Sequence, residues 1–428
     1  MPARTRSGNS LRVAVLADSD TRWKWGALTA RRIVGDDTGA DITGLLLRGR
    51  ATPTSRQLSE VAGGVEAPRE VTGTEFIDLV RTGPYDVIVL ALVGGSVQAL
   101  LHGLARLWPH PTRRPVLVTG YVGVVYEKLT DGLLLRHGAD LVLANSPYDA
   151  ERFREVYEGV GADADSVTEA ALPFLGGAPY GGVADALVFA AQPSVPEKRA
   201  DRAYLLRRLV THARLHPARE VVLKLRSKPG EHTTHIEELP YQRLARDLAP
   251  PPNFRLAYGH MGEVLDRAGL LVTVSSTAAL ESLHRGIPTA VLTDLGVREP
   301  LGNHYFLGSG CLTSFDRLDA GHRPAADPGW LARHGVAPRP DPYHCVRTKV
   351  AELLDRPQLP PPAPYYTSVT ATGYLPGILA RHRLDEAPPE RLTGVRRVVR
   401  DAVRDAARGA YRHGVQRVAP AIRRMGEL

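Results

Sequence analysis

Three consecutive hydroxyl residues, Ser275, Ser276 and Thr277, stand where a helix is predicted to begin, directly after an apolar run at 270–274. The apolar run is typical of a buried strand. At such a strand–turn–helix junction the free backbone N–H groups and the helix dipole attract anions, so this stretch could bind a nucleotide phosphate. Glu281, about one turn into the helix, could accept hydrogen bonds from ribose hydroxyls. Ser and Thr are also ordinary N-caps, and an unspecialised capped helix is the alternative.

A basic loop follows another predicted strand of the same half. Lys224, Arg226 and Lys228 place positive charge at the carboxyl end of that strand, as phosphate binding requires. His232 could contact a phosphate or a carboxylate, although a loop histidine is more often simply solvated. His232 and His235 have a spacing found in zinc sites, but no third ligand is evident in the sequence, so we expect no metal. Gln192 and Ser194, in the loop after the first strand of this half, are predicted to converge on the same site.

The loop after the first predicted strand of the chain holds the candidate general base. Asp18 and Asp20 stand close to Lys24 and to two tryptophans, Trp23 and Trp25. A carboxylate here could take the proton of an acceptor hydroxyl, and Asp20 is the first choice and Asp18 the second. Lys24 and the tryptophan rings could bind an acceptor sugar. The alternative is an N-cap aspartate followed by tryptophans that pack into the core.

A glycine-containing loop at the same end of the predicted sheet offers further candidates. Gly120 and Gly123 permit close approach to the backbone, so we place Gly120 with the acceptor site. Glu127 and Asp131 follow in the same loop, and either carboxylate could replace Asp20 as the base. A simple turn also explains the glycines.

These candidates are carried by short apolar runs that alternate with helical patterns. In the first half, strands are predicted at 11–17, 42–47, 87–92, 115–119 and 141–144, with helices at about 22–34, 55–62, 74–82, 95–107 and 147–157. In the second half, strands at 186–191, 220–225, 254–257 and 270–274 alternate with helices at 198–215 and 236–248, and a further β-branched strand follows Pro288. Such alternation indicates an α/β fold with parallel sheets, whose ligands gather at the carboxyl ends of the strands.

Breaks in this periodicity predict the domain boundaries. Glycine and proline interrupt it around 173–183, and a proline-rich stretch follows at 359–364. We therefore expect an N-terminal domain at 1–178, a second domain at 179–364 and a C-terminal segment at 365–428. Residues 365–383 of that segment could cross back onto the first domain.

The stretch from Ser275 to Pro288 resembles the donor-nucleotide element in the C-terminal half of GT-B glycosyltransferases. It is most similar to bacterial capsule-type enzymes that use CMP-activated ulosonic acids such as Kdo and sialic acids, and the whole chain resembles an actinobacterial group of glycosyltransferases. The resemblance implies two Rossmann-like domains facing a cleft, a base in the N-terminal half, and a place near the nucleobase for His260. Related enzymes commonly carry Lys-x-His-Pro where this chain has Lys224-Leu-Arg-Ser-Lys-Pro229, so its histidine roles differ from the family pattern.

The function implied by the resemblance is inverting, metal-independent transfer of a sugar to a cell-surface glycan or lipid-linked acceptor, with a nucleotide-sugar as substrate and no cofactor. A UDP-sugar 2-epimerase has the same fold and a similar hydroxyl-rich turn, but it would need no acceptor. The third possibility is a CDP-polyol phosphate transferase or a non-catalytic nucleotide-binding relative.

The charge of the chain is concentrated at one end. The formal net charge is +8, and residues 391–428 contribute ten arginines against three acidic residues. This placement argues against nucleic acid as a partner, because the rest of the chain is nearly neutral. Valine and alanine recur on one face of the helix predicted there, which favours an anionic membrane surface. A partner helix and a solvated appendage are the alternatives.

Localisation follows from what the sequence lacks. It has two cysteines, no apolar run of the ~20 residues that a membrane span needs, and no apolar signal-peptide core at its N-terminus. We expect a cytoplasmic protein that is peripheral on the inner face of the plasma membrane.

Overall fold

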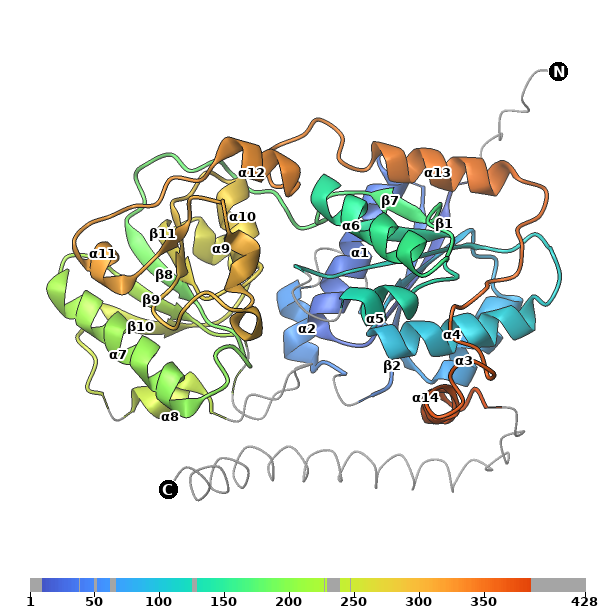
Figure 1. Ribbon diagram of the computed structural model, residues 1–428, viewed down its shortest axis with the longest axis horizontal. Coiled ribbons are helices and arrows are strands. Elements are labelled where there is room, and N and C mark those ends of the chain that lie inside the picture. Colours follow the sequence, from blue (N-terminus) through green and yellow to red (C-terminus); the bar gives the residue numbers. More distant parts are fainter. Residues whose placement is uncertain are drawn as a thin grey trace. The chain divides into compact units, whose positions relative to one another are not determined.

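The structure is a computed structural model that describes residues 10–37, 39–49, 52–61, 67–124, 129–226, 228, 239–246 and 248–385. Its contacts divide the chain into two compact units (Figure 1). The first unit contains the residues up to Thr52, Val61–Phe174 and the segment that begins at Pro338. The second contains Pro53–Glu60 and Leu175–Ala337.

The first unit is built on a parallel sheet of seven strands in the order β3-β2-β1-β4-β5-β6-β7. Its strands are β1 (Arg12–Ala17), β2 (Asp41–Leu47), β3 (Arg69–Val71), β4 (Val87–Ala91), β5 (Val116–Gly120), β6 (Leu141–Ala144) and β7 (Val167–Glu169). The helices between them are α1 (Asp20–Val34), α3 (Gly73–Thr82), α4 (Gly94–Leu107), α5 (Leu129–Leu134) and α6 (Pro147–Gly159). The central strands are buried along their whole length because helices cover both faces of the sheet.

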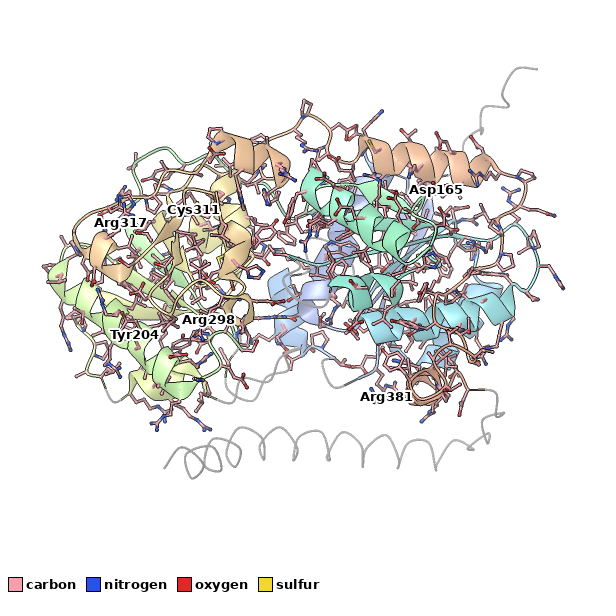
Figure 2. The ribbon with its side chains drawn as sticks, viewed as in Figure 1. Asp165, Tyr204, Arg298, Cys311, Arg317 and Arg381 are labelled. Atoms are coloured by element: carbon pink, nitrogen blue, oxygen red, sulfur yellow. The ribbon has the colours of Figure 1, made fainter. Side chains whose placement is uncertain are left out.

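The second unit repeats this plan with six parallel strands in the order β10-β9-β8-β11-β12-β13. The strands are β8 (Ala186–Ala190), β9 (Val221–Lys224), β10 (Phe254–Ala257), β11 (Ala268–Thr273), β12 (Thr289–Leu292) and β13 (Leu312–Thr313). The α-helices are α7 (Arg199–Leu215), α8 (Tyr241–Ala245), α9 (Met261–Leu265), α10 (Ala278–His284), α11 (Phe315–Asp319) and α12 (Pro328–Arg333), with short 3-10 helices at Glu299–Leu301 and Asn303–Phe306. Tyr204 of α7, labelled in Figure 2, donates a hydrogen bond to Asp294 in the loop after β12.

Two parallel α/β sheets confirm the predicted fold class of two Rossmann-like domains. The C-terminal helical tail of that prediction lies outside the described residues. Helix α2 (Ser55–Val61) and most of the longer strands occur where the periodicity predicts them, whereas α8 is much shorter than the helix predicted at 236–248. Among the described residues, no helix has both the length and the apolar character needed to cross a membrane.

The chain after residue 337 packs against the first unit. Arg114 donates to both carboxylate oxygens of Asp140, at 2.7 and 2.9 Å, and to the carbonyl of Pro360. This contact places the proline-rich stretch with the first unit. The sequence pattern had instead predicted that the second domain continues to residue 364. Helices α13 (His344–Asp355) and α14 (Leu375–His382) follow the same course, and Leu375 and Ile378 join the core of the first unit.

One buried carboxylate makes the stability of the first unit sensitive to pH. Asp149 lies in the first turn of α6, is 3% exposed, and has one oxygen with no hydrogen-bond partner among the described residues. Burial raises the pKa of this carboxyl group to about 6, although Ser146 and Arg152 partly oppose the shift. The folded state therefore binds this proton more tightly than the unfolded state does.

We predict that Asp149→Asn removes this pH dependence. The contribution of Asp149 to stability is fully present below about pH 4, where the carboxyl group is protonated even in the unfolded chain, and is lost as the pH rises through about 6. Relative to the wild type, the variant should gain roughly 2–3 kcal/mol in the free energy of unfolding between pH 4 and 7. Urea denaturation across this range measures the difference. The matched control is Asp36→Asn, which changes an exposed aspartate. If the difference in the free energy of unfolding between Asp149→Asn and the wild type did not change with pH, the raised pKa of Asp149 would be contradicted.

Candidate functional site

The carboxyl edge of the second sheet contains a topological switch point between β8 and β11. From β8 the chain proceeds to β9 and β10 on one side, and β11, β12 and β13 lie on the other. In doubly wound sheets such a point leaves a crevice in which ligands bind. Gln192 follows β8 and Ser275 follows β11, so both predicted site residues lie at this point.

Gln192 and Ser275 bind each other across the switch point. The Oε1 atom of Gln192 accepts a hydrogen bond from the backbone N–H of Ser275 at 3.0 Å, and Nε2 donates to the Ser275 hydroxyl at 3.2 Å. The hydroxyl in turn donates to the carbonyl of Leu301 at 2.5 Å, and Ser275 is fully buried. The structure therefore gives Ser275 a different role from the predicted phosphate contact, because its hydroxyl joins two loops and has no surface for a ligand.

The next two hydroxyl residues are partly exposed and form the turn into α10. The Ser276 N–H donates to Thr273 Oγ1, and the Ser276 hydroxyl accepts from the N–H of Ala278 at 3.3 Å. Thr277 already has helical backbone angles and makes no side-chain cap. Glu281 is 8% exposed, so the predicted ribose contact would require this buried carboxylate to become accessible.

The basic loop after β9 separates into one buried and two accessible cations. Lys224 is 6% exposed, and its ammonium group donates to the carbonyl of Leu225 at 2.8 Å. Arg226 is half-buried and Lys228 is exposed, with the Lys228 ammonium 5.9 Å from the centre of the Tyr258 ring. Arg226 and Lys228 are therefore the accessible positive charges of this loop, and the predicted His232 lies outside the described residues.

Two further predicted residues occupy the loops of the same edge. Ser194 is half-buried in the loop after β8. His260 is the N-cap of α9, and its Nδ1 atom accepts a hydrogen bond from the N–H of Gly262 at 3.2 Å. Because Nδ1 accepts in this bond, the proton of the neutral ring lies on Nε2.

A residue that the sequence analysis missed fixes the loop after β8. Arg202 of α7 is 1% exposed, and its guanidinium lies 4.1 Å from the centre of the Tyr241 ring. Its Nη1 atom donates to carbonyl oxygens of that loop, those of Gln192, Pro193 and Pro196. An arginine in an amphipathic helix normally faces solvent, so the sequence carries no signal of this role.

The first sheet has an equivalent switch point between β1 and β4, and Asp18 bridges it. One oxygen of Asp18 accepts from Arg22 at 2.6 Å, and the other accepts from the backbone N–H of Val93 at 3.0 Å. Asp20 is the first residue of α1, is 7% exposed and accepts a hydrogen bond from the Thr21 hydroxyl. The helix is capped by neither aspartate, because Ser19 is its N-cap.

The predicted acceptor residues are mostly buried. Trp23 and Trp25 are both fully buried, so neither ring has a face available for a sugar. Gly120 packs against Trp25, since a Cβ atom at Gly120 would lie 2.9 Å from the tryptophan ring. The stacking role of Trp25 and the acceptor role of Gly120 are therefore corrected to packing roles. Lys24 is partly exposed, with its ammonium group 5.0 Å from the centre of the Phe174 ring.

Two other side chains at this edge were also missed by the sequence analysis. Arg136 is 6% exposed, donates to the carbonyls of Gly120 and Gly132, and stacks on the Tyr121 ring. His382, at the end of α14, hydrogen-bonds to Ser96 at 3.2 Å, and burial lowers its pKa. The predicted Glu127 lies outside the described residues.

Solved structures of similar fold include a UDP-GlcNAc 2-epimerase from Neisseria meningitidis bound to UDP-GlcNAc. It is 10% identical, with a TM-score of 0.47, and the match covers 81% of this chain and 99% of that one. A UDP-GlcNAc 2-epimerase from Methanocaldococcus jannaschii is 10% identical, with a TM-score of 0.49 and coverage of 80% and 98%. The glycotransferase of kitacinnamycin is 13% identical, with a TM-score of 0.42 and coverage of 88% and 98%.

The sequence comparisons assign the chain to a family. No curated protein matches the chain. A family model does match, over residues 13–353, which include most of both units. The chain therefore belongs to the family described as "Putative glycosyltransferase (DUF6716)".

Proposed function

We propose that the protein is an inverting, metal-independent glycosyltransferase that takes its sugar from a nucleotide-sugar. The family match names the reaction class. The observation that supports the choice of residues is the switch point of the second sheet. There Gln192 and Ser275 join two loops, and the loop after β9 supplies the accessible cations Arg226 and Lys228. A nucleotide diphosphate or monophosphate has the charge that such a carboxyl edge attracts.

In this proposal Ser276, Arg226 and Lys228 bind the nucleotide phosphate. Negative charge grows on the phosphate as the glycosidic bond breaks, and fixed donors aimed at that charge stabilise the transition state. Gln192, Ser275 and Arg202 do not contact the phosphate but hold the loops in place through the hydrogen bonds described above. The partly exposed Ser194 and His260 stay in the proposed donor site as residues that surround the nucleotide, and the buried Glu281 and Lys224 lie behind them.

The donor we propose is a CMP-activated ulosonic acid, on the basis of the resemblance of the stretch from Ser275 to Pro288. The acceptor is then a hydroxyl of a cell-surface glycan or lipid-linked saccharide. A UDP-sugar 2-epimerase and a CDP-polyol phosphate transferase are the competing activities, and they differ in the nucleotide that each would bind.

We predict that CMP stabilises the wild-type protein more than CDP, UDP, GDP or ADP does in a thermal-shift panel. A ligand at ~100 times its dissociation constant adds roughly 2.7 kcal/mol to the free energy of unfolding. Ser276→Ala should weaken CMP binding about 10- to 100-fold, because a hydrogen bond to a charged group contributes ~1.5–3 kcal/mol.

The matched control for this panel is Ser314→Ala, which removes a similar capping hydroxyl from the turn after β13. It should leave CMP binding unchanged. A preference for UDP or CDP would overturn the proposed donor, and the absence of a response to any nucleotide would overturn the donor site itself.

We predict that Asp20→Asn abolishes transfer while nucleotide binding is retained. Loss of a general base lowers turnover by about 10²–10⁴-fold. The assay follows nucleotide release from the sugar donor that the panel selects, with and without acceptor and in the presence of EDTA. Asp18→Asn is the comparison, because it breaks the ion pair with Arg22 and should lower thermal stability more than Asp20→Asn does. Full activity in Asp20→Asn would mean that Asp20 is not the base and that Asp18 or Glu127 has this role instead.

We also propose that residues 391–428 bind an anionic membrane surface, which would bring the enzyme to a lipid-linked acceptor. The ten arginines of this segment should make the full chain co-sediment with vesicles that contain phosphatidylglycerol, and added salt should weaken the binding. A chain that ends at residue 385 should remain in the supernatant. Equal binding to purely zwitterionic vesicles, or binding by the shortened chain, would rule the proposal out.

A further inference from the structure

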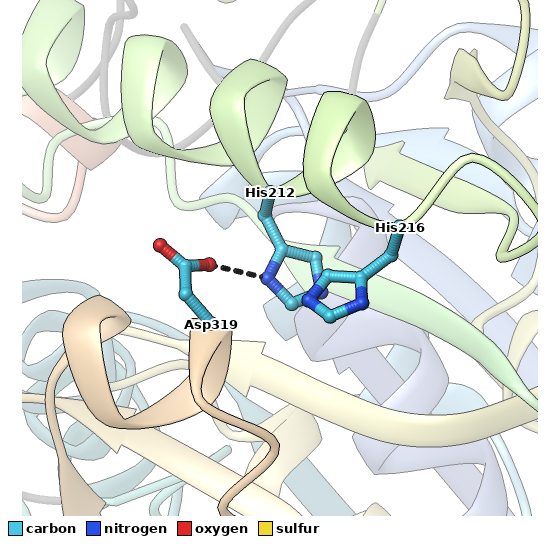
Figure 3. Close-up of side chains that lie close together, drawn as sticks. All are labelled: His212, His216 and Asp319. Atoms are coloured by element: carbon cyan, nitrogen blue, oxygen red, sulfur yellow. Dashed lines mark hydrogen bonds and ion pairs between the residues drawn. The ribbon is translucent and has the colours of Figure 1, made fainter.

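Two histidines and an aspartate that are not part of the proposed donor or acceptor site meet between α7 and α11 (Figure 3). His212 lies in the last turn of α7, His216 is the C-cap of the same helix, and Asp319 is the last residue of α11. One potential ligand atom from each residue lies within 4.8 Å of those from the other two. Side chains four residues apart lie on one face of a helix, so both rings point to the same place.

Both rings carry a buried nitrogen that the protein leaves unbonded. The Nδ1 atom of His212 is 2.6 Å from Asp319 Oδ1, but the Nε2 atoms of His212 and His216 have no hydrogen-bond partner among the described residues. The ring centres are 4.3 Å apart. Buried polar atoms are nearly always bonded in folded proteins, so two such nitrogens on neighbouring rings require an explanation.

The bond to Asp319 decides which nitrogen of His212 has a lone pair. An ionised carboxylate only accepts, so Nδ1 carries the proton and, in the neutral ring, Nε2 carries the lone pair. A histidine that donates one N–H to a carboxylate and offers its other nitrogen outward is the common arrangement of metal-binding histidines.

The cations near the cluster are compensated. Arg208 pairs with Asp316 at 2.7 Å and with Asp319 at 2.9 Å. Arg219 and Arg323 both pair with Asp185, at 3.0 and 2.8 Å, so three arginines face three carboxylates. A divalent ion beside these arginines would therefore meet a local charge that the three carboxylates already balance.

We propose that His212 and His216 bind one Zn²⁺-like divalent ion through their Nε2 atoms, with Asp319 holding His212 in the tautomer that binds. Two imidazole nitrogens suit borderline transition ions and not Mg²⁺ or Ca²⁺, which prefer oxygen ligands. The end of α7 lies at the amino edge of the sheet, because α7 starts at the carboxyl end of β8 and returns the chain to the start of β9. The ion would thus fix the end of α7 at the edge opposite the proposed donor site, while the bond from His212 to Asp319 links this end to α11.

The test uses the full chain, stripped of metal with a chelator and dialysed against Zn²⁺ at pH 7.5. We expect one bound Zn²⁺ per chain. His216→Gln should weaken the affinity at least tenfold, and Asp319→Asn about 10- to 100-fold, as losses around bound metals usually do. His216 is preferred for substitution because it is less buried than His212. The affinity of the wild type should also fall between pH 7.5 and 5.5, since protons compete for the imidazoles.

The control is His344→Gln, which removes an exposed histidine from α13 and should change the affinity less than twofold. Far-UV circular dichroism establishes that each variant is folded. Titration of the wild type with Co²⁺ needs no variant, and it should produce the intense visible absorption of a nitrogen-ligated, four-coordinate ion. A folded wild type that binds no stoichiometric Zn²⁺, a Co²⁺ spectrum of the aqueous ion alone, or a folded His216→Gln with unchanged affinity would each overturn the proposal.

Discussion

The hydrogen bonds across the two switch points are the interactions on which both candidate sites depend. In each unit the first strand lies between two parallel neighbours, and the connections on its two sides diverge at the carboxyl edge. A backbone N–H group faces this gap and needs a hydrogen-bond acceptor. In the first unit Asp18 accepts from Val93 at 3.0 Å, and in the second Gln192 accepts from Ser275 at the same distance. A side chain after the first strand thus closes the gap to the fourth strand in both units.

This closure divides the residues of each edge into supporting and accessible groups. Both oxygens of Asp18 are engaged, and the Ser275 hydroxyl is enclosed, so these side chains shape the edge. Buried arginines complete the support: Arg136 binds carbonyls beside Tyr121, and Arg202 binds carbonyls beside Tyr241. An arginine offers five donors in a fixed plane and also stacks on rings, so one side chain can fix several loop carbonyls. At the edge of the second sheet, Ser276, Arg226 and Lys228 remain accessible, and these are the residues proposed to contact the phosphate.

The sequence predicts the long elements of this fold well and the direction of individual side chains poorly. Strands of four to seven residues with apolar character were predicted, whereas β3, β7 and β13, of two or three residues, are too short to show any periodicity. Three adjacent hydroxyls predict the turn after β11, but adjacency does not distinguish the enclosed Ser275 from the partly exposed Ser276. Trp25, in a charged and polar stretch, is similarly indistinguishable from a surface tryptophan until its packing against Gly120 is known.

Contacts between distant parts of the sequence could not be predicted from any local pattern. His216 precedes a proline and has the sequence context of an ordinary helix end, and Asp319 lies more than one hundred residues further along the chain. Only the parallel order of the strands brings α11 beside α7. The histidine spacing noted in the sequence was local. It involves His232 and His235, for which no metal was expected and which lie outside the described residues.

Helix α7 connects the two edges of the second unit, which explains why its polar side chains are so fully engaged. At its start, Arg202 fixes the loop that contains Gln192. Tyr204, Arg208 and His212 then follow at intervals of four residues, and each contacts a carboxylate: Asp294 for the first and Asp319 for the other two. Residues at this spacing form one stripe along a helix, so the contacts fix both the rotation and the position of α7. His216 continues the stripe for one more turn but meets no carboxylate of its own in the described part of the chain, and an ion shared with His212 would supply a partner. The helix that positions the donor loop is thus held near both ends by buried polar contacts, those of Arg202 and that of His212 with Asp319.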